Sequence, residues 1–506
     1  MEILLVYKTG FDNEKYLEEQ SREILSRVQS SDNRLYLEFG GKIMYDHHAS
    51  RVLPGYDSNV KIRLLEKLRD RAEIILCIYA GDIEKRKIRG DFGITYDADA
   101  LMLIDGFRSR GIDLRGVVIT RFENQPSAIS FENRLKRRDI DVFRHYYTKG
   151  YPTDIDLIVS PEGYGRNDYI EPFKPLVVVT GPGPGSGKLA TCLSQLYHDH
   201  RNGICSNYAK FETFPIWNLP LKHPVNAAYE AATADLRDVN LVDPFHLDAY
   251  GEVAINYNRD VEAFPLLKRI LERITGDISP YASPTDMGVN RAGFGITDDE
   301  VVRKAAMQEI IRRYFRYSCE YVMGLADKST VQKVELLMRN FELSPSCRPV
   351  VEPALERMRL KESEEGIDNG KAAALLLKDG SFVTGTGSDL MHASGALILN
   401  AVKKLAGISK EVHLLSPATI DSIRELKKVM EIPTLNLDLE EVLIALSVSS
   451  ATSEAAASAM KKLFELRGCE AHLTHMPSPG DGNGLRNLGI NVTSDPVFSS
   501  EKLYVN

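Results

Sequence analysis

The feature that most constrains the fold of this 506-residue sequence is a glycine-rich loop between an apolar run and an amphipathic stretch. The run Leu176–Thr180 (LVVVT) is apolar almost throughout, which predicts a strand buried on both faces of a parallel sheet. The loop Gly181–Lys188 (GPGPGSGK) follows it directly. After the loop, apolar side chains recur with helical spacing, at Leu189, Cys192, Leu193, Leu196 and Tyr197. A strand, a glycine-rich loop and a helix in this order predict an α/β domain with an anion site.

The composition of the loop indicates phosphate as the anion. Backbone N–H groups of such a loop can turn inward, the dipole of the following helix favours negative charge, and a lysine adds a cation. We therefore expect a nucleotide such as ATP with Mg²⁺, or a phosphorylated metabolite, to bind here, with Lys188 also stabilising charge in catalysis. The expected ligand contacts come from Gly181, Gly183, Gly185, Ser186, Gly187, Lys188 and Thr191.

The loop departs from the phosphate-binding pattern GxxxxGK[ST] at two positions. Pro182 stands where the pattern has its first glycine, and Leu189 stands where it has the Ser or Thr that holds magnesium. Thr191 and Ser186 are the hydroxyls that could replace it. The missing hydroxyl favours binding of the ligand without its metal-assisted turnover. The alternative interpretation is that the loop is only a tight strand-to-helix turn and binds no ligand.

Apolar runs alternate with helical patterns through residues 1–202, which predicts a Rossmann-like α/β domain with a parallel sheet. Helices are expected over 97–110 and 127–138. Further strands are expected at Met1–Tyr7, Arg34–Leu37, Glu73–Tyr79, Gly116–Thr120, Asp141–Tyr146 and Asp156–Ser160.

Two more regions follow. Residues 203–356 form a middle region, irregular with short helices up to residue 295 and helical over 298–345, with Asp298 as a cap. Residues 357–506 form a carboxy-terminal α/β domain that begins with a linker or exposed turn over 357–370. In it, strands are expected at Lys371–Lys378, Val412–Ser416 and Ala471–His475, and helices over 390–405 and 439–466.

Other candidate site residues lie outside the loop. Asp46 and His48 are expected to act in catalysis, one histidine serving as acid or base with Asp46 orienting it. Adjacent histidines on an extended chain point to opposite faces, so His47 and His48 are not expected to share a metal. Each of these residues could instead have a structural role. The expected substrate contacts, from a basic loop and the irregular middle region, are Arg89, His223, Asn258 and Arg259.

Composition excludes several classes of protein. The 63 basic and 71 acidic residues give a net charge of −8, which argues against a nucleic-acid-binding chain. No apolar run approaches the length of a membrane span, and the six cysteines show no CxxC spacing for a zinc ribbon. We expect a cytoplasmic protein with a phosphate-bearing small molecule as its partner. Formation of a homo-oligomer stays an open possibility.

Several strings in the sequence resemble one known family, the bacterial proteins with domain of unknown function 1846. The resemblance covers residues 10–506 and implies an α/β amino-terminal region, a helical and irregular middle, and a carboxy-terminal domain of cytidine-deaminase-like architecture. It implies no activity, and it makes Gly181–Lys188 the family's hallmark loop. The strings are EFGGK…DHHASRVLPGY (38–56), KIRGDFGITYD (87–97), GYPTDIDLIVSPEGYG (150–165), VVVTGPGPGSGK (177–188), YAKFETFPIWNLPLKHPVN (208–226) and SPTDMGVNRAGF (283–294).

Zinc deamination is not expected despite that resemblance. Zinc deaminases need H-x-E or C-x-E at the helix start and P-C-x-x-C later, whereas this chain has His392-Ala393-Ser394 and no PCxxC. The leading prediction is an enzyme that transfers a phosphoryl or other group with ATP or a phosphorylated metabolite. A non-catalytic regulator that binds such a ligand is the alternative, and a transferase that works without ATP stays open.

Overall fold

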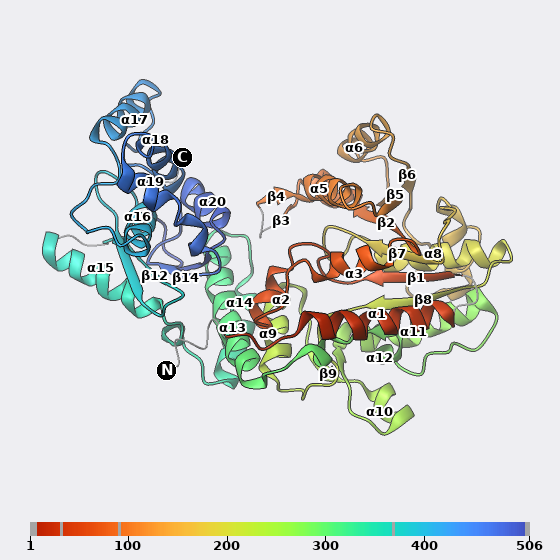
Figure 1. Cartoon of the computed structure of the whole chain (residues 1–506). Coiled ribbons are helices and arrows are strands. Elements are labelled where there is room, and N and C mark those ends of the chain that lie inside the picture. Colours follow the sequence, from red (N-terminus) through yellow and green to blue (C-terminus); the bar gives the residue numbers. More distant parts are fainter. Residues whose placement is uncertain (1–7, 31–33, 90–92, 367–369, 501–506) are drawn as a thin grey trace. The chain divides into compact units, whose positions relative to one another are not determined.

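The computed structural model describes residues 8–30, 34–89, 93–366 and 370–500, and it divides into two compact units (Figure 1). The first unit comprises Thr9–Glu230 and Asp238–Ala306, and the second comprises Lys8, Ala231–Arg237 and the described residues from Met307 onward. The segment 203–356, which the sequence suggested as a region of its own, is shared between these units. The strand expected at Met1–Tyr7 lies outside the described residues.

The first unit is built on a seven-stranded parallel sheet in the order β11-β8-β1-β7-β2-β5-β6. The expected α/β class with a parallel sheet is therefore confirmed. All five residues of β7 are buried, as the continuous apolar run LVVVT predicts for a central strand. The strands are β1 (Arg34–Phe39), β2 (Ala72–Tyr79), β5 (Asp113–Thr120), β6 (Val142–Arg144), β7 (Leu176–Thr180), β8 (Ser206–Phe211) and β11 (Gly288–Val289).

Helices α8 and α11 pack against one face of this sheet. Their apolar side chains, among them Cys192, Leu196 and Phe264, form one buried cluster with Val177 and Val179 of β7. Two small antiparallel pairs, β3 (Ile88–Arg89) with β4 (Ile94–Thr95) and β9 (Asn240–Val242) with β10 (Ile255–Tyr257), complete the strands. The helices up to residue 287 are α1 (Asn13–Gln29), α2 (His47–Val52), α3 (Val60–Leu68), α4 (Ala80–Glu84), α5 (Tyr96–Arg108), α6 (Pro126–Lys136), α7 (Ile155–Ile158), α8 (Lys188–Arg201), α9 (Pro224–Ala232), α10 (Pro244–Tyr250), α11 (Asn258–Thr275) and α12 (Pro284–Met287).

Two expectations for this region were wrong. The run 156–160 is not a strand: Asp154 accepts a hydrogen bond from the Leu157 amide at 3.0 Å and so caps the short helix α7. The segment 203–295 is more regular than its composition suggested, because it contains the sheet strands β8 and β11 and the 18-residue helix α11.

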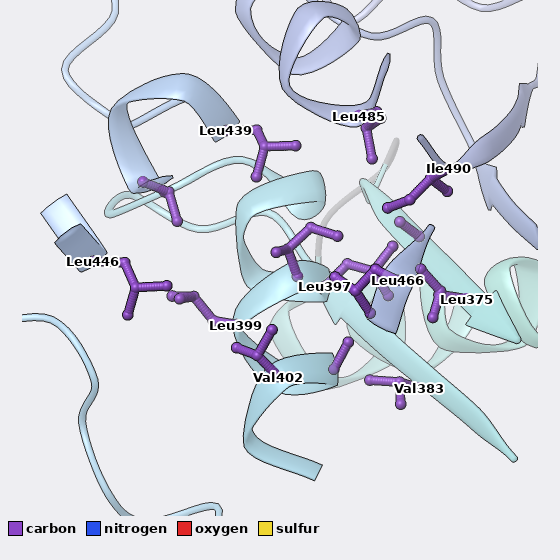
Figure 2. Packing of buried hydrophobic residues seen from close by; sticks show 14 of the residues in the cluster. Leu375, Val383, Leu397, Leu399, Val402, Leu439, Leu446, Leu466, Leu485 and Ile490 are labelled. Carbon is purple, nitrogen blue, oxygen red and sulfur yellow. The ribbon is translucent and has the colours of Figure 1, made fainter. Parts of the chain in front are cut away.

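The second unit contains a four-stranded sheet in the order β13-β12-β14-β15, in which only β14 and β15 run parallel. Helix α16 packs on it, and Figure 2 shows Leu397 and Val402 of this helix in a cluster with Leu375 of β12 and Leu439 of α18. The strands are β12 (Ala372–Leu376), β13 (Phe382–Thr386), β14 (Glu470–Leu473) and β15 (Asn491–Ser494). The helices from residue 299 on are α13 (Asp299–Val322), α14 (Lys328–Asn340), α15 (Val351–Glu365), α16 (Ala393–Leu405), α17 (Pro417–Val429), α18 (Leu439–Ser449), α19 (Glu454–Met460) and α20 (Pro479–Asn487).

Most sequence expectations for this half of the chain are confirmed, and two were wrong. Residues 412–416 form no strand, and most of the expected linker 357–370 continues helix α15 as far as Glu365. Leu414 and Leu415 of this run are nevertheless buried in the core, so their apolar character serves the packing of the unit without a strand. In the part of the chain that the structure describes, no helix combines the length and apolar character needed to cross a bilayer.

Candidate functional site

The glycine-rich loop lies at the carboxyl edge of the parallel sheet, where open α/β sheets bind their ligands. It connects β7, which pairs with β1 on one side and β2 on the other, to the amino end of α8. Gly187 is the residue before the helix and has a φ of +92°, a conformation that glycine adopts without strain. The predicted order of strand, loop and helix is confirmed.

Close packing explains why three positions of the loop require glycine. A Cβ at Gly181 would lie 2.4 Å from the carbonyl oxygen of Cys77, which belongs to β2. One at Gly183 would lie 2.6 Å from the hydroxyl of Tyr96, and one at Gly187 would lie 2.7 Å from Cγ2 of Thr120. The loop is therefore wedged between the ends of β2 and β5 and the start of α5.

The end of β5 also holds the loop through hydrogen bonds. The Thr120 hydroxyl donates to the Ser186 carbonyl at 2.8 Å, and the Arg121 guanidinium donates to the Gly185 carbonyl. The same guanidinium lies 3.4 Å from the centre of the Tyr79 ring, a cation–π contact that fixes its position. These bonds occupy carbonyl oxygens and leave the amides of the loop to other partners.

The amino end of α8 offers unpaired N–H groups. The first helical bond runs from the Thr191 amide to the Gly187 carbonyl at 3.0 Å, and no side chain caps the helix. The amides of Lys188, Leu189 and Ala190 have no acceptor among the described residues. The Lys188 ammonium lies 3.3 Å from the Gly183 carbonyl and 3.4 Å from the Ser186 hydroxyl, so this cation bends back over the loop. Burial lowers the pKa of Lys188, although the charge of Glu38 opposes the shift.

Charged side chains from β1 and β8 lie at the same edge of the sheet. Glu38 pairs in register with Lys210 and accepts a hydrogen bond from the Tyr208 hydroxyl at 2.7 Å. Lys210 forms ion pairs with Glu212, at 2.6 Å, and with Asp260 of α11. Burial raises the pKa of Glu212, although the attraction of Lys210 opposes the shift.

Lys210, Glu212, Asp260 and Thr120 were not found from the sequence. The signal for Lys210 was present but weak: β8 reads SNYAKF, and a strand that carries Asn and Lys looks like a polar loop. Four of its six residues, Tyr208 among them, are buried, and Asn207 and Lys210 are half-buried.

The hydroxyl of Thr191, expected to contact the ligand, lies in the core. It accepts a hydrogen bond from the Cys77 thiol at 3.3 Å and lies 3.4 Å from Nδ1 of His145. Burial lowers the pKa of His145 to about 4, so this imidazole is neutral at physiological pH. Of the two hydroxyls considered for the metal side of the loop, only that of Ser186 lies beside the Lys188 ammonium.

Asp46 and His48 occupy a helix, and the extended chain expected around the two histidines was wrong. Asp46 caps α2 by accepting from the Ala49 amide at 3.2 Å, and it binds the Lys61 ammonium at 2.8 Å. Although burial opposes the charged form, Lys61 lowers the pKa of Asp46 to about 2. His48 is buried, with its ring edge-on to Phe214 at 5.4 Å. Catalysis by these two residues stays a prediction.

The four expected substrate contacts each have a partner within the first unit. Arg89 binds the buried Asp99 at 2.6 Å, and His223 lies 2.9 Å from Asp299. Asn258 accepts from the Val239 amide at 2.8 Å, and Arg259 lies 3.2 Å from Asp238. Asn258 and Arg259 directly precede Asp260, the partner of Lys210, so α11 brings them to the region of β8. The role of Arg89 and His223 in ligand binding stays a prediction.

Within the described ranges, no three or more His, Cys, Asp or Glu side chains are grouped so that they could hold a metal ion. The oxygen atoms nearest to the loop lysine are the Gly183 carbonyl and the Ser186 hydroxyl.

Comparison with known proteins identifies the family. Residues 9–342 match the model of the amino-terminal domain of unknown function DUF1846, and residues 346–504 match the model of its carboxy-terminal counterpart. A UPF0371 protein of Clostridium tetani is 58% identical over 501 residues, 99% of this chain and 100% of the relative. UPF0371 proteins of Clostridium botulinum strains Langeland and Alaska E43 are 57% and 56% identical over the same shares. The chain belongs to this bacterial family of unknown function, which confirms the resemblance found in its motifs.

Proposed function

We propose that the first unit binds the phosphate group of a nucleotide or phosphorylated metabolite at Gly181–Lys188, and that the protein transfers a phosphoryl or other group from that ligand. The observation that carries the proposal is the combination of a lysine ammonium bent over the loop and three unpaired amides at the start of α8. A phosphate dianion satisfies both, because amides and an ammonium are its usual donors in proteins.

The neighbouring carboxyl groups supply a means of proton transfer. Glu212, whose pKa burial raises, would be the base that accepts a proton from a hydroxyl or amine that attacks the phosphate. Lys188 and the loop amides would stabilise the negative charge that develops on the phosphate oxygens. If ATP is the ligand, the Ser186 hydroxyl would be the oxygen ligand that the loop offers to its Mg²⁺, which would offset charge between the phosphates.

A regulator that binds the same ligand without turnover is the second candidate. Leu189 carries no hydroxyl where nucleotide hydrolases hold their metal, and the Thr191 hydroxyl is used in the core. Turnover therefore separates the two candidates. A protein that binds a nucleotide tightly, yet transfers no group to water or to any co-substrate in a metabolite mixture, would be the regulator.

The test begins with a thermal-shift screen of nucleotides and phosphorylated metabolites against the full chain. For the ligand that stabilises it most, isothermal titration calorimetry compares the wild type with Lys188→Ala and with the control Lys149→Ala, which removes an exposed lysine paired with Glu162. We expect Lys188→Ala to weaken binding by roughly tenfold or more, the value of one charge-assisted hydrogen bond. Equal affinities for the three proteins would contradict the proposal.

For the second unit we infer a cytidine-deaminase-like architecture. The antiparallel strands β12 and β13, followed directly by α16, support it, since that order of strand, strand and helix opens the deaminase fold. Zinc chemistry is not part of the proposal, because the residues at the start of α16 are His392, Ala393 and Ser394 and lack the catalytic glutamate.

A further inference from the structure

The start of α16 carries a histidine–aspartate pair that the proposed function does not use. His392 is the residue that precedes the helix, and its Nδ1 lies 2.7 Å from a carboxylate oxygen of Asp481 in α20. The Asp481 side chain is 1% exposed, whereas the His392 side chain is 23% exposed. The buried member of the pair is thus the carboxylate, and the imidazole reaches the surface.

Asp481 is fixed by a full set of donors. Besides His392, it accepts hydrogen bonds from the Ser394 and Ser478 hydroxyls and, at 2.9 Å, from the Leu439 amide. A carboxylate held in this way stays ionised and cannot rotate, so it fixes both the tautomer and the direction of the imidazole. With Nδ1 bound to Asp481, His392 presents Nε2, for which no acceptor exists among the described residues.

Further donors converge on the same place. The helix start has no side-chain cap, so the first amides of α16 are unpaired within the described chain. A Cβ at Gly387 would lie 3.5 Å from Cβ of Lys371 and 3.7 Å from the Ala393 amide nitrogen, so Lys371 borders the helix start across a glycine. Lys371 is exposed and forms no ion pair within the described residues, although the charge of Asp481 acts on it.

A buried polar atom without a partner marks the same region. His475 is 6% exposed, and its Nδ1 has no hydrogen-bond partner in the described part of the chain. The pairing of β12 with β14, extended by two residues, sets His475 opposite Lys371. Burial lowers the pKa of His475 to about 4. The charges of Lys371 and His392 act in the same direction, and those of Asp481 and Asp495 oppose it. An orphaned nitrogen here points to a ligand that completes the hydrogen bonding.

We propose that the start of α16 is a second anion-binding site, in which His392, protonated on both ring nitrogens, donates from Nε2 to a phosphate group while the helix amides and Lys371 provide the remaining donors. Two imidazoles, an ammonium and a helix start suit a dianion better than a single carboxylate. The site stands independently of the glycine-rich loop, because it uses only residues 371–481.

The experiment measures how fast diethyl pyrocarbonate acylates each histidine of the full chain at pH 7, read by peptide mass spectrometry. Inorganic phosphate and sodium chloride are compared at equal ionic strength. We expect saturating phosphate to slow modification of His392 roughly tenfold by mass action, while the exposed His413 reacts at an unchanged rate. Lys371→Ala, which alters an exposed side chain, is expected to raise the phosphate concentration needed for protection.

A Lys188→Ala background separates this site from the loop. Protection of His392 that persists in this variant supports a second site, whatever becomes of binding at the loop. Protection that disappears with Lys188→Ala, or equal rates in phosphate and chloride, would overturn the proposal. The absence of any acylation at His392 in chloride would do so as well, since the site requires an accessible Nε2.

Discussion

Single residues explain where the sequence was informative and where it was not. The spacing of the glycines and Lys188 identified the loop, because backbone conformation and close packing leave few alternatives at Gly181, Gly183 and Gly187. The direction of a hydroxyl is set by tertiary packing. Thr191 follows the loop closely in sequence, as a residue that contacts the ligand would. Its side chain nevertheless bonds to Cys77 and His145, which lie 114 and 46 positions away in sequence. Contacts of that range leave no local signal.

His145 gives a prediction about acid stability. Its pKa is lowered to about 4 by burial, whereas an unfolded histidine titrates near 6.5, so between these values only the unfolded state binds the proton. The contribution of His145 to the free energy of unfolding is therefore fully present above about pH 6.5. It falls by about 1.4 kcal/mol per pH unit as the pH drops to about 4. His145→Gln is expected to flatten this slope in urea unfolding measured from pH 4.5 to 7. The control His413→Gln, at an exposed site, is expected to keep the slope of the wild type, and identical slopes for all three proteins would count against a neutral buried His145.

Secondary structure elements were predicted best where burial is uniform and worst where polar residues take part in a fold. β7, β2 and α16 follow from continuous or periodic apolar residues. Helix α11 was missed because Pro265 stands inside it, and a proline normally argues against a helix interior. Here it is the eighth residue, and the helix continues to Thr275 without the hydrogen bond that a backbone N–H at this position would donate. β8 was missed because it contains Asn207 and Lys210. Lys210 lies at the charged carboxyl edge of the sheet, and such polar residues hide the apolar pattern of a strand.

The contact between the loop and β5 gives a prediction at this scale. Gly187→Ala would force a Cβ to 2.7 Å from Thr120 and strain a φ of +92°, whereas Gly185→Ala meets the strain of a φ of +74° with no atom within 4 Å. The backbone term alone costs about 1–2 kcal/mol, and overpacking adds about 1–3 kcal/mol at Gly187. Urea unfolding is therefore expected to rank Gly187→Ala well below Gly185→Ala in stability. Equal losses for the two variants would mean that the loop is not wedged against β5.

At the scale of the whole molecule, the fold class of each half could be predicted from the sequence. The contribution of the segment 203–295, which lies between them in sequence, could not. The alternation of strands and helices indicated the parallel sheet, but two of its seven strands, β8 and β11, come from the segment 203–295. Their pairing with β1 and with each other depends on contacts far apart in sequence. Because this segment supplies strands beside β1, it adds Lys210 and Glu212 to the edge of the sheet where the loop lies.

This topology leads to a prediction about the bound state. A ligand whose phosphate occupies Gly181–Lys188 would extend over the carboxyl ends of β1 and β8, where Lys210 lies beside Glu38 in register. Ordering that edge would protect its amides, since exchange requires local opening. Hydrogen exchange with the best ligand of the thermal screen is therefore expected to slow in peptides covering 206–212 and 258–262 as well as in 181–190, and Lys188→Ala is expected to remove all three effects together. Protection confined to 181–190 would mean that the segment 203–295 contributes strands to the sheet and no contacts to the ligand.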